Sequence, residues 1–136
     1  MTGELLFAFE RIIIMKKVAI IEDDTAIASM YKMKLDAAGY DVKTAENGLI
    51  GFDLVKNFNP DLILLDLMMP EMTGDQMLAE MRKMPWGKNT KVIILTNKGE
   101  TEAPSSLNKL GVRKYIVKAE MTPRQVADLV KVELES

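Results

Sequence analysis

Five short aliphatic runs recur along this chain, and each is followed by a stretch whose apolar residues have helical spacing. The clearest run, Leu62 to Leu65, contains no polar residue and is too short for a typical helix, as expected of a strand buried on both faces. We predict strands over 17–21, 40–45, 62–65, 91–95 and 115–117. We predict helices over 25–38, 49–57, 74–84, 102–110 and 122–134. This alternation predicts an α/β fold with helices on both faces of a parallel sheet.

Polar residues follow four of the predicted strands. In the doubly wound order 2-1-3-4-5, the first and third strands lie side by side where the connections reverse, and ligands bind at the carboxyl ends of strands there. The polar residues at these ends are Glu22, Asp23, Asp66, Thr96 and Lys118. We therefore expect three carboxylates, a hydroxyl and an amine to meet at one edge of the sheet.

The composition excludes several kinds of site. The 136 residues contain no cysteine and no histidine, which excludes thiolate chemistry, Ser–His triads and imidazole ligands. Any metal must therefore be held by oxygen, which favours Mg²⁺, Mn²⁺ or Ca²⁺. The net charge of -2 gives no general attraction to nucleic acid, so we expect no direct nucleic-acid contact. No run reaches the roughly 18 apolar residues of a membrane span, so we expect no membrane association.

The chain divides into an N-terminal extension over 1–15 and a single domain over 16–136. The extension has two apolar runs separated by Glu10 and Arg11, and it lacks the basic start and the small-residue cleavage site of a signal peptide. Three explanations stay open: an extra helical turn or strand on the body, a misassigned translation start, or a segment that binds a partner.

The acidic residues at the strand ends are suited to phosphoryl transfer. Two carboxylates about 4 Å apart repel by about 4 kcal/mol at an effective dielectric near 20, and a divalent cation relieves this repulsion. Mg²⁺ fits, because it takes a few carboxylates, and the backbone carbonyl of Met68 offers a neutral ligand. Asp66 can then act as a nucleophile, while Lys118 and Thr96 hold the transferred group.

Each of these residues has an ordinary structural explanation when it is taken alone. Asp24 is best explained as a helix cap, Thr96 as a strand-end hydroxyl and Lys118 as a surface charge. Met68 and the methionines at 69, 72 and 77 are expected to pack in the core or the loops. Only the occurrence of acid pair, acid, hydroxyl and amine at four strand ends in this order favours a functional site.

From about residue 16 to residue 135, the chain resembles the receiver domain of two-component response regulators, the CheY-like family. Four segments carry the resemblance: Val18-Ala19-Ile20-Ile21-Glu22-Asp23-Asp24, Asp61 to Pro70 with Gly74, Ile93-Ile94-Leu95-Thr96, and Tyr115-Ile116-Val117-Lys118. The resemblance implies a flavodoxin-like (βα)5 three-layer sandwich, of the stand-alone single-domain type.

By the same resemblance, Asp66 is the phosphoacceptor for a sensor histidine kinase or a histidine phosphotransfer protein. Asp23 and Asp66 would bind Mg²⁺ directly with the Met68 carbonyl, and Glu22 would bind it through water. Thr96 and Lys118 would contact the phosphoryl group, and Thr96 and Tyr115 would form the switch. The resemblance further implies a cytoplasmic monomer or weak homodimer that is not an enzyme, apart from slow self-dephosphorylation at most. It does not identify the downstream target.

Three departures from the family pattern stand out. Ala119 occupies the position after the lysine where the family usually has proline, so we expect a trans Lys118–Ala119 bond. Asn97 follows Thr96 where a small residue is usual, which predicts narrower access to the phosphate. The predicted helix over 102–110 begins with the weak helix formers Pro104, Ser105 and Ser106.

Three alternatives remain open. A receiver-like interaction module that never takes phosphate would not need the complete set of site residues. A Mg²⁺-dependent phosphatase with an aspartyl nucleophile would need a second acid where Met68 stands. A flavin or nucleotide carrier would need a glycine-rich loop after the first strand, and the sequence has none there.

Overall fold

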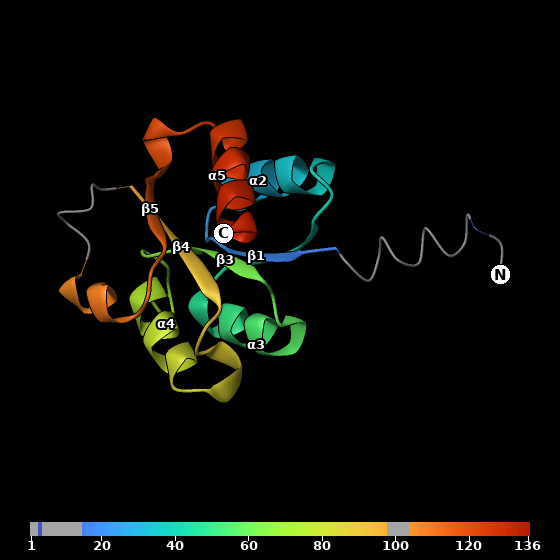
Figure 1. The fold of residues 1–136 in the computed structure, drawn as a ribbon. Coiled ribbons are helices and arrows are strands. Elements are labelled where there is room, and N and C mark those ends of the chain that lie inside the picture. Colours follow the sequence, from blue (N-terminus) through green and yellow to red (C-terminus); the bar gives the residue numbers. More distant parts are fainter. Residues whose placement is uncertain (1–2, 4–14, 98–103) are drawn as a thin grey trace.

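A five-stranded parallel sheet in the order β2-β1-β3-β4-β5 forms the centre of the molecule (Figure 1). The computed structural model describes Gly3, residues 15–97 and residues 104–136. The strands are β1 (Lys17–Ile21), β2 (Asp41–Ala45), β3 (Leu62–Asp66), β4 (Lys91–Thr96) and β5 (Lys114–Val117). The predicted α/β fold and strand order are confirmed. Asp66 and Thr96 are the last residues of their strands rather than the first residues of the loops.

Four α-helices cover the sheet in two layers (Figure 1). They are α2 (Thr25–Ala37), α3 (Gly48–Phe58), α4 (Gly74–Arg82) and α5 (Pro123–Glu135). One core joins the sheet to α2 and α5, and the other joins it to α3 and α4. β3 is buried at every residue, because the two layers cover its alternate side chains. The result is the predicted three-layer sandwich.

Local signals in the sequence set the ends of these helices. The side chain of Asp24 accepts hydrogen bonds from the Ala26 and Ile27 amides, as the predicted helix cap. The helix stops before Gly39, whose φ of 95° is easily reached only by glycine. Thr122 and Gln125 form a capping box with Pro123 in the first turn of α5.

The fourth predicted helix, over 102–110, is wrong in the part of the chain that the structure describes. The prediction covered 102–110, of which 102 and 103 lie outside the described residues. Residues 105–109 form only a short 3₁₀ helix, η3 (Ser105–Lys109), in which Leu107 alone is buried. Pro104, Ser105 and Ser106 disfavour an α-helix, and one buried side chain gives too little packing to offset this.

The burial of two helix side chains does not follow from helical spacing in the sequence. Met30 has helical spacing with other apolar residues of α2 but is 48% exposed, because Ala28, Tyr31 and Leu35 form the buried stripe. Glu133 of α5 was not recognised, yet it is buried beside Val126 and Val130. The described residues also form two further short 3₁₀ helices, η1 (Pro85–Gly87) and η4 (Lys118–Glu120), in segments where no helix was predicted.

The proposed extension over 1–15 lies almost wholly outside the described residues and stays a prediction. Within the described part of the chain, no helix has the length and apolar character needed to cross a membrane.

Candidate functional site

The carboxyl ends of four strands bring the predicted site residues to one edge of the sheet. Glu22 follows β1, Asp66 ends β3, Thr96 ends β4 and Lys118 follows β5. Four polar or charged residues are buried in the described chain, and three of them are Glu22, Asp66 and Thr96. Buried polar groups are costly unless they have partners. Three of them at one edge of the sheet therefore indicate a functional site rather than separate helix caps.

Three carboxylates meet at this edge. Glu22, Asp23 and Asp66 each offer an oxygen, and these oxygens lie within 4.8 Å of one another. Asp23 is exposed, whereas the other two are buried. The cluster therefore opens to solvent on the side of Asp23, from which a cation can enter with water still bound.

The ammonium group of Lys118 lies between two of these carboxylates. Its Nζ donates a 2.6 Å hydrogen bond to Oε1 of Glu22 and lies 3.5 Å from Oδ1 of Asp66. Burial alone would lower the pKa of Lys118, but the hydrogen bond to Glu22 and the charges of both carboxylates outweigh burial and raise this pKa. Lys118 is thus a fixed cation within the cluster.

Asp66 has one satisfied oxygen and one without a partner. Its Oδ1 accepts a 3.3 Å hydrogen bond from the Met68 amide. Its Oδ2 is the one buried side-chain polar atom in the described residues that has no hydrogen-bond partner. An orphaned carboxylate oxygen in a polar cluster is where a ligand is expected to bind.

The environment of Asp66 disfavours its charge. Burial, followed by interaction with the Glu22 and Asp23 carboxyls, raises the pKa of Asp66 to about 8, and Lys118 opposes this only in part. Interaction with the Asp66 carboxyl lowers the pKa of Asp23 from its usual value. The two shifts run in opposite directions because Asp66 is buried, which disfavours its charge, whereas Asp23 is exposed.

The loop after β3 fixes the backbone of Asp66. The Gly74 amide donates a 2.9 Å hydrogen bond to the Leu67 carbonyl, and a Cβ at position 74 would overlap the carbonyl oxygen of Asp66. Glu71 has a φ of 69°, and the Met72 amide donates a 2.8 Å hydrogen bond to the Pro70 carbonyl across it. This γ-turn returns the loop to the start of α4.

The remaining predicted residues lie around this centre. The side chain of Met68 is 66% exposed in the loop after β3, so of the two expected positions, core or loop, it takes the loop. Tyr115 is partly buried on β5, pairs in register with Ile94 and packs against the core that α3 and α4 cover. Asn97 is exposed. No described peptide bond is cis, so the expected trans Lys118–Ala119 bond is confirmed.

The sequence reasoning missed the ion pair between Lys118 and Glu22. Lys118 was assigned only to a phosphoryl group, and Glu22 only to a metal. The two residues are 96 positions apart and follow strands that are not neighbours in the sheet. The sequence shows that both residues follow strands. Which of the three acids Lys118 contacts depends on side-chain packing, which the sequence pattern does not show.

Comparisons with known proteins agree with the fold. Residues 18–131 match the response regulator receiver domain. The chain is 36% identical over 115 residues to the transcriptional regulatory protein SrrA of Staphylococcus aureus, which covers 85% of this chain but only 46% of SrrA. The chain thus spans just under half the length of this relative.

Solved structures of receiver proteins superpose on the chain. The chemotaxis protein CheY4 of Vibrio cholerae has a TM-score of 0.80 at 27% identity, covering 87% of this chain and 98% of CheY4. The phosphorylated cyanobacterial phytochrome response regulator RcpA has a TM-score of 0.73 at 28% identity, covering 89% of this chain and 92% of RcpA. With the match over 18–131, these similarities show that the chain belongs to the response regulator receiver domain family.

Proposed function

We propose that this protein is a phosphoacceptor of a two-component system that takes a phosphoryl group on Asp66. The observation that carries the proposal is the buried, unpartnered Oδ2 of Asp66 beside two further carboxylates and the Lys118 ammonium. A purely structural carboxylate would have its oxygens satisfied by protein groups. The unpartnered oxygen is explained if it attacks a phosphoryl group or binds a metal ion, either of which arrives from solution.

The donor set fits Mg²⁺. Carboxylate oxygens of Asp23 and Asp66, the Met68 carbonyl and Glu22 through water would hold the ion, and these are hard oxygen ligands. When bound, the ion supplies positive charge that favours the ionised form of Asp66 and neutralises phosphate oxygens. Because Asp23 is exposed, the ion can enter the cluster from that side.

The proposed transfer uses groups already present in the chain. A lone pair of Asp66 Oδ2 forms a bond to phosphorus as the phosphorus–nitrogen bond of a phosphohistidine breaks, and the departing imidazole takes up a proton. Lys118 Nζ lies 3.5 Å from Asp66 Oδ1, close enough to reach a phosphoryl group on Asp66. It would then donate a hydrogen bond to a phosphoryl oxygen as well as to Glu22. Thr96 ends the neighbouring strand and would donate its hydroxyl to another oxygen.

The proposed output is a change in surface rather than turnover. Met68 stands where an acid–base residue of an aspartyl phosphatase would be, so the acyl phosphate would persist as a charge switch. Movement of Thr96 toward the phosphate would draw Tyr115 inward, because β4 and β5 pair directly. The partner surface would then be η3, β5 and α5.

The proposed phosphate donor is a sensor histidine kinase or a histidine phosphotransfer protein. The phosphorylated state named for RcpA supports the same chemistry here. SrrA is a transcriptional regulatory protein, but the matched segment is less than half of it. We therefore carry over to this chain only the receiver's role.

The test is incubation with acetyl phosphate and Mg²⁺, followed by intact mass measurement. We expect one added phosphoryl group that is lost in Asp66→Asn, is retained in Asp53→Asn on the exposed face of α3, and fails to form when EDTA removes the metal. No adduct under any condition would favour an interaction module that never takes phosphate. Continuous release of phosphate at enzyme-like rates would favour the phosphatase.

A further inference from the structure

A cavity of about 440 Å³ lies at the edge of the sheet opposite to the acidic cluster. Its walls come from the ends of α4 and η3 and from the segments that lead into β4 and β5. Lys91 begins β4, whereas Thr96 ends it beside the acidic cluster. At about 3.3 Å per residue, the strand separates the two sites by about 16 Å. The cavity is therefore distinct from the proposed phosphorylation site.

Positive charge is concentrated in this cavity. The cationic side chains that line it are Arg82, Lys88, Lys91, Lys109 and Arg113. Among the described residues of its lining there is no acidic and no aromatic side chain. Since the whole chain has a net charge of -2, the gathering does not follow from a basic composition. Like charges in a concave site raise the local potential and attract anions.

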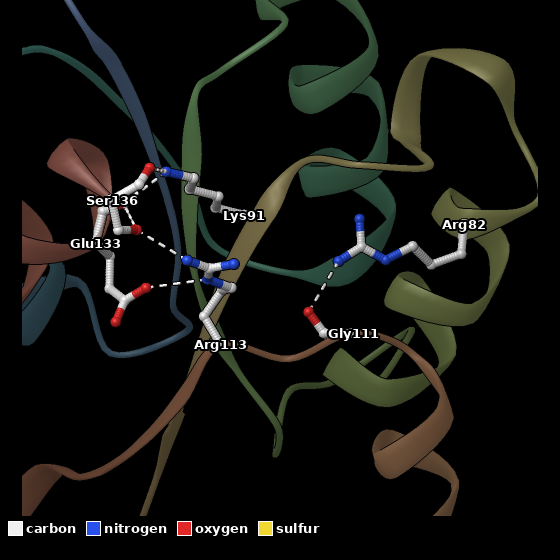
Figure 2. A network of polar contacts seen from close by, with 6 residues as sticks. All are labelled: Arg82, Lys91, Gly111, Arg113, Glu133 and Ser136. Carbon is white, nitrogen blue, oxygen red and sulfur yellow. Dashed lines mark hydrogen bonds and ion pairs between the residues drawn. The ribbon is translucent and has the colours of Figure 1, made fainter.

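Arg82 is fixed in the wall by neutral partners. Its Nε donates a 2.8 Å hydrogen bond to the Leu110 carbonyl, and its Nη1 donates a 2.9 Å bond to the Gly87 carbonyl. A weaker contact of 3.5 Å joins Nη2 to the Gly111 carbonyl (Figure 2). Because carbonyl groups orient the guanidinium without cancelling its charge, Arg82 still presents a full positive charge to the cavity.

Lys91 and Arg113 also line the cavity, and their charged ends turn toward Glu133 and Ser136 (Figure 2). Lys91 Nζ donates to the backbone carbonyl of Glu133 at 2.6 Å and to a main-chain oxygen of Ser136, the last residue of the sequence, at 2.9 Å. Arg113 pairs with the Glu133 carboxylate at 3.0 Å and donates to the Ser136 hydroxyl at 2.8 Å. Arg113 thus has a carboxylate partner, whereas Arg82 is held by neutral carbonyl groups. The positive walls are held in place before any ligand arrives, which lowers the entropic cost of binding.

We infer that this cavity binds a small anion that carries two or more phosphate groups. Guanidinium and ammonium groups are the usual phosphate ligands, and the five in the lining, of which Arg113 is paired with Glu133, exceed what one phosphate would neutralise. Lys88 and Lys109 are exposed at the rim and can close on such an anion. The volume lies within the usual range for ligand sites. The lining has no aromatic ring for a nucleotide base, so the phosphate chain itself is the recognised group.

The test is calorimetric titration with tripolyphosphate in metal-free buffer, with amide NMR spectra to locate the ligand. We expect saturable binding that shifts the amides of 88–90 and 109–111. Lys109→Glu should weaken binding about tenfold, as expected for loss of one charged contact. Lys34→Glu makes the same charge change on α2, across the sheet, and should leave affinity within about twofold. ATP should bind no more tightly than tripolyphosphate.

The absence of saturable binding would overturn the inference, as would equal weakening by both variants. Shifts centred on Thr96 and Lys118 would place the anion at the other edge of the sheet and also overturn it. ATP binding much more tightly than tripolyphosphate would overturn the assignment to the phosphate chain. The Asp66→Asn variant should bind tripolyphosphate normally, so this inference and the proposed phosphoacceptor can fail independently.

Discussion

The ammonium group of Lys118 donates a 2.6 Å hydrogen bond to the carboxylate of Glu22, and both side chains are buried. An ion pair of the same length joins Lys32 to Asp36 on the surface of α2, where both side chains are more than 40% exposed. The two ion pairs have the same length and differ in burial, so comparing them shows how burial changes the contribution of an ion pair to stability. The buried pair is also part of the candidate site, because Lys118 lies 3.5 Å from Asp66.

We expect Lys118→Met to lower the free energy of unfolding by about 2–4 kcal/mol in EDTA, because Glu22 would be left buried without its cation. Lys32→Met should cost less than about 0.5 kcal/mol, because its pair is solvated. Mg²⁺ should stabilise Lys118→Met more than the parent, since the ion replaces the missing positive charge. Urea unfolding with and without Mg²⁺ measures both effects. Equal costs for the two lysines would contradict the role assigned to burial.

Substitution of Gly74 should disturb Asp66 through the backbone. The Cβ of Gly74→Ala would overlap the Asp66 carbonyl oxygen, so we expect a loss of about 2–4 kcal/mol and slower phosphorylation by acetyl phosphate. Gly39→Ala is the control, because position 39 has open space and only its φ of 95° resists a side chain. It should cost about 1–2 kcal/mol and leave the phosphorylation rate unchanged. A Gly74→Ala protein that is phosphorylated at the parent rate would show that this contact does not position Asp66.

Stability without metal should fall as pH rises through the neutral range. The folded pKa of Asp66 is about 8, above the usual 3.8, so its contribution is fully present below about pH 3.8 and is lost as pH rises through about 8. Relative to Asp66→Asn, the parent should lose up to about 1.4 kcal/mol per pH unit within this window. The lowered pKa of Asp23 acts in the opposite sense, but only below about pH 4.

Urea unfolding of both proteins in EDTA, at several values from about pH 5 to about pH 7.5, measures this difference. Parallel curves for the parent and Asp66→Asn across that range would mean that Asp66 ionises normally in the folded protein.

Mg²⁺ should stabilise the folded chain through the acidic cluster. At about 100 times its dissociation constant, the ion should add about 2.7 kcal/mol to the free energy of unfolding. Asp23→Asn should remove most of this gain. Asp24→Asn changes the charge equally one residue away, keeps the α2 cap because asparagine caps as well, and should retain the gain. Thermal unfolding with Mg²⁺ and with EDTA decides the matter, and an equal loss in both variants would indicate a general charge effect.

Much of the fold was predictable because it depends on local patterns. The aliphatic run from Leu62 to Leu65 identifies a strand buried on both faces, and the cap at Asp24 and the stop at Gly39 are local signals that the structure reproduces. The helix predicted over 102–110 failed in its described part, because weak helix formers there lack a buried stripe. The exposure of Met30 could not be predicted, because adjacent apolar residues leave two possible stripes on α2 and only packing against the sheet selects one.

The sequence by itself determined the alternation of strands and helices, and therefore that Glu22, Asp66, Thr96 and Lys118 end strands of one parallel sheet. That follows from hydrophobic periodicity, which acts over a few residues. Only the tertiary structure decided that Lys118 pairs with Glu22, that one oxygen of Asp66 stays unpartnered, and that five cations line a cavity at the opposite edge. These depend on distances between side chains far apart in the chain, which packing sets and periodicity does not.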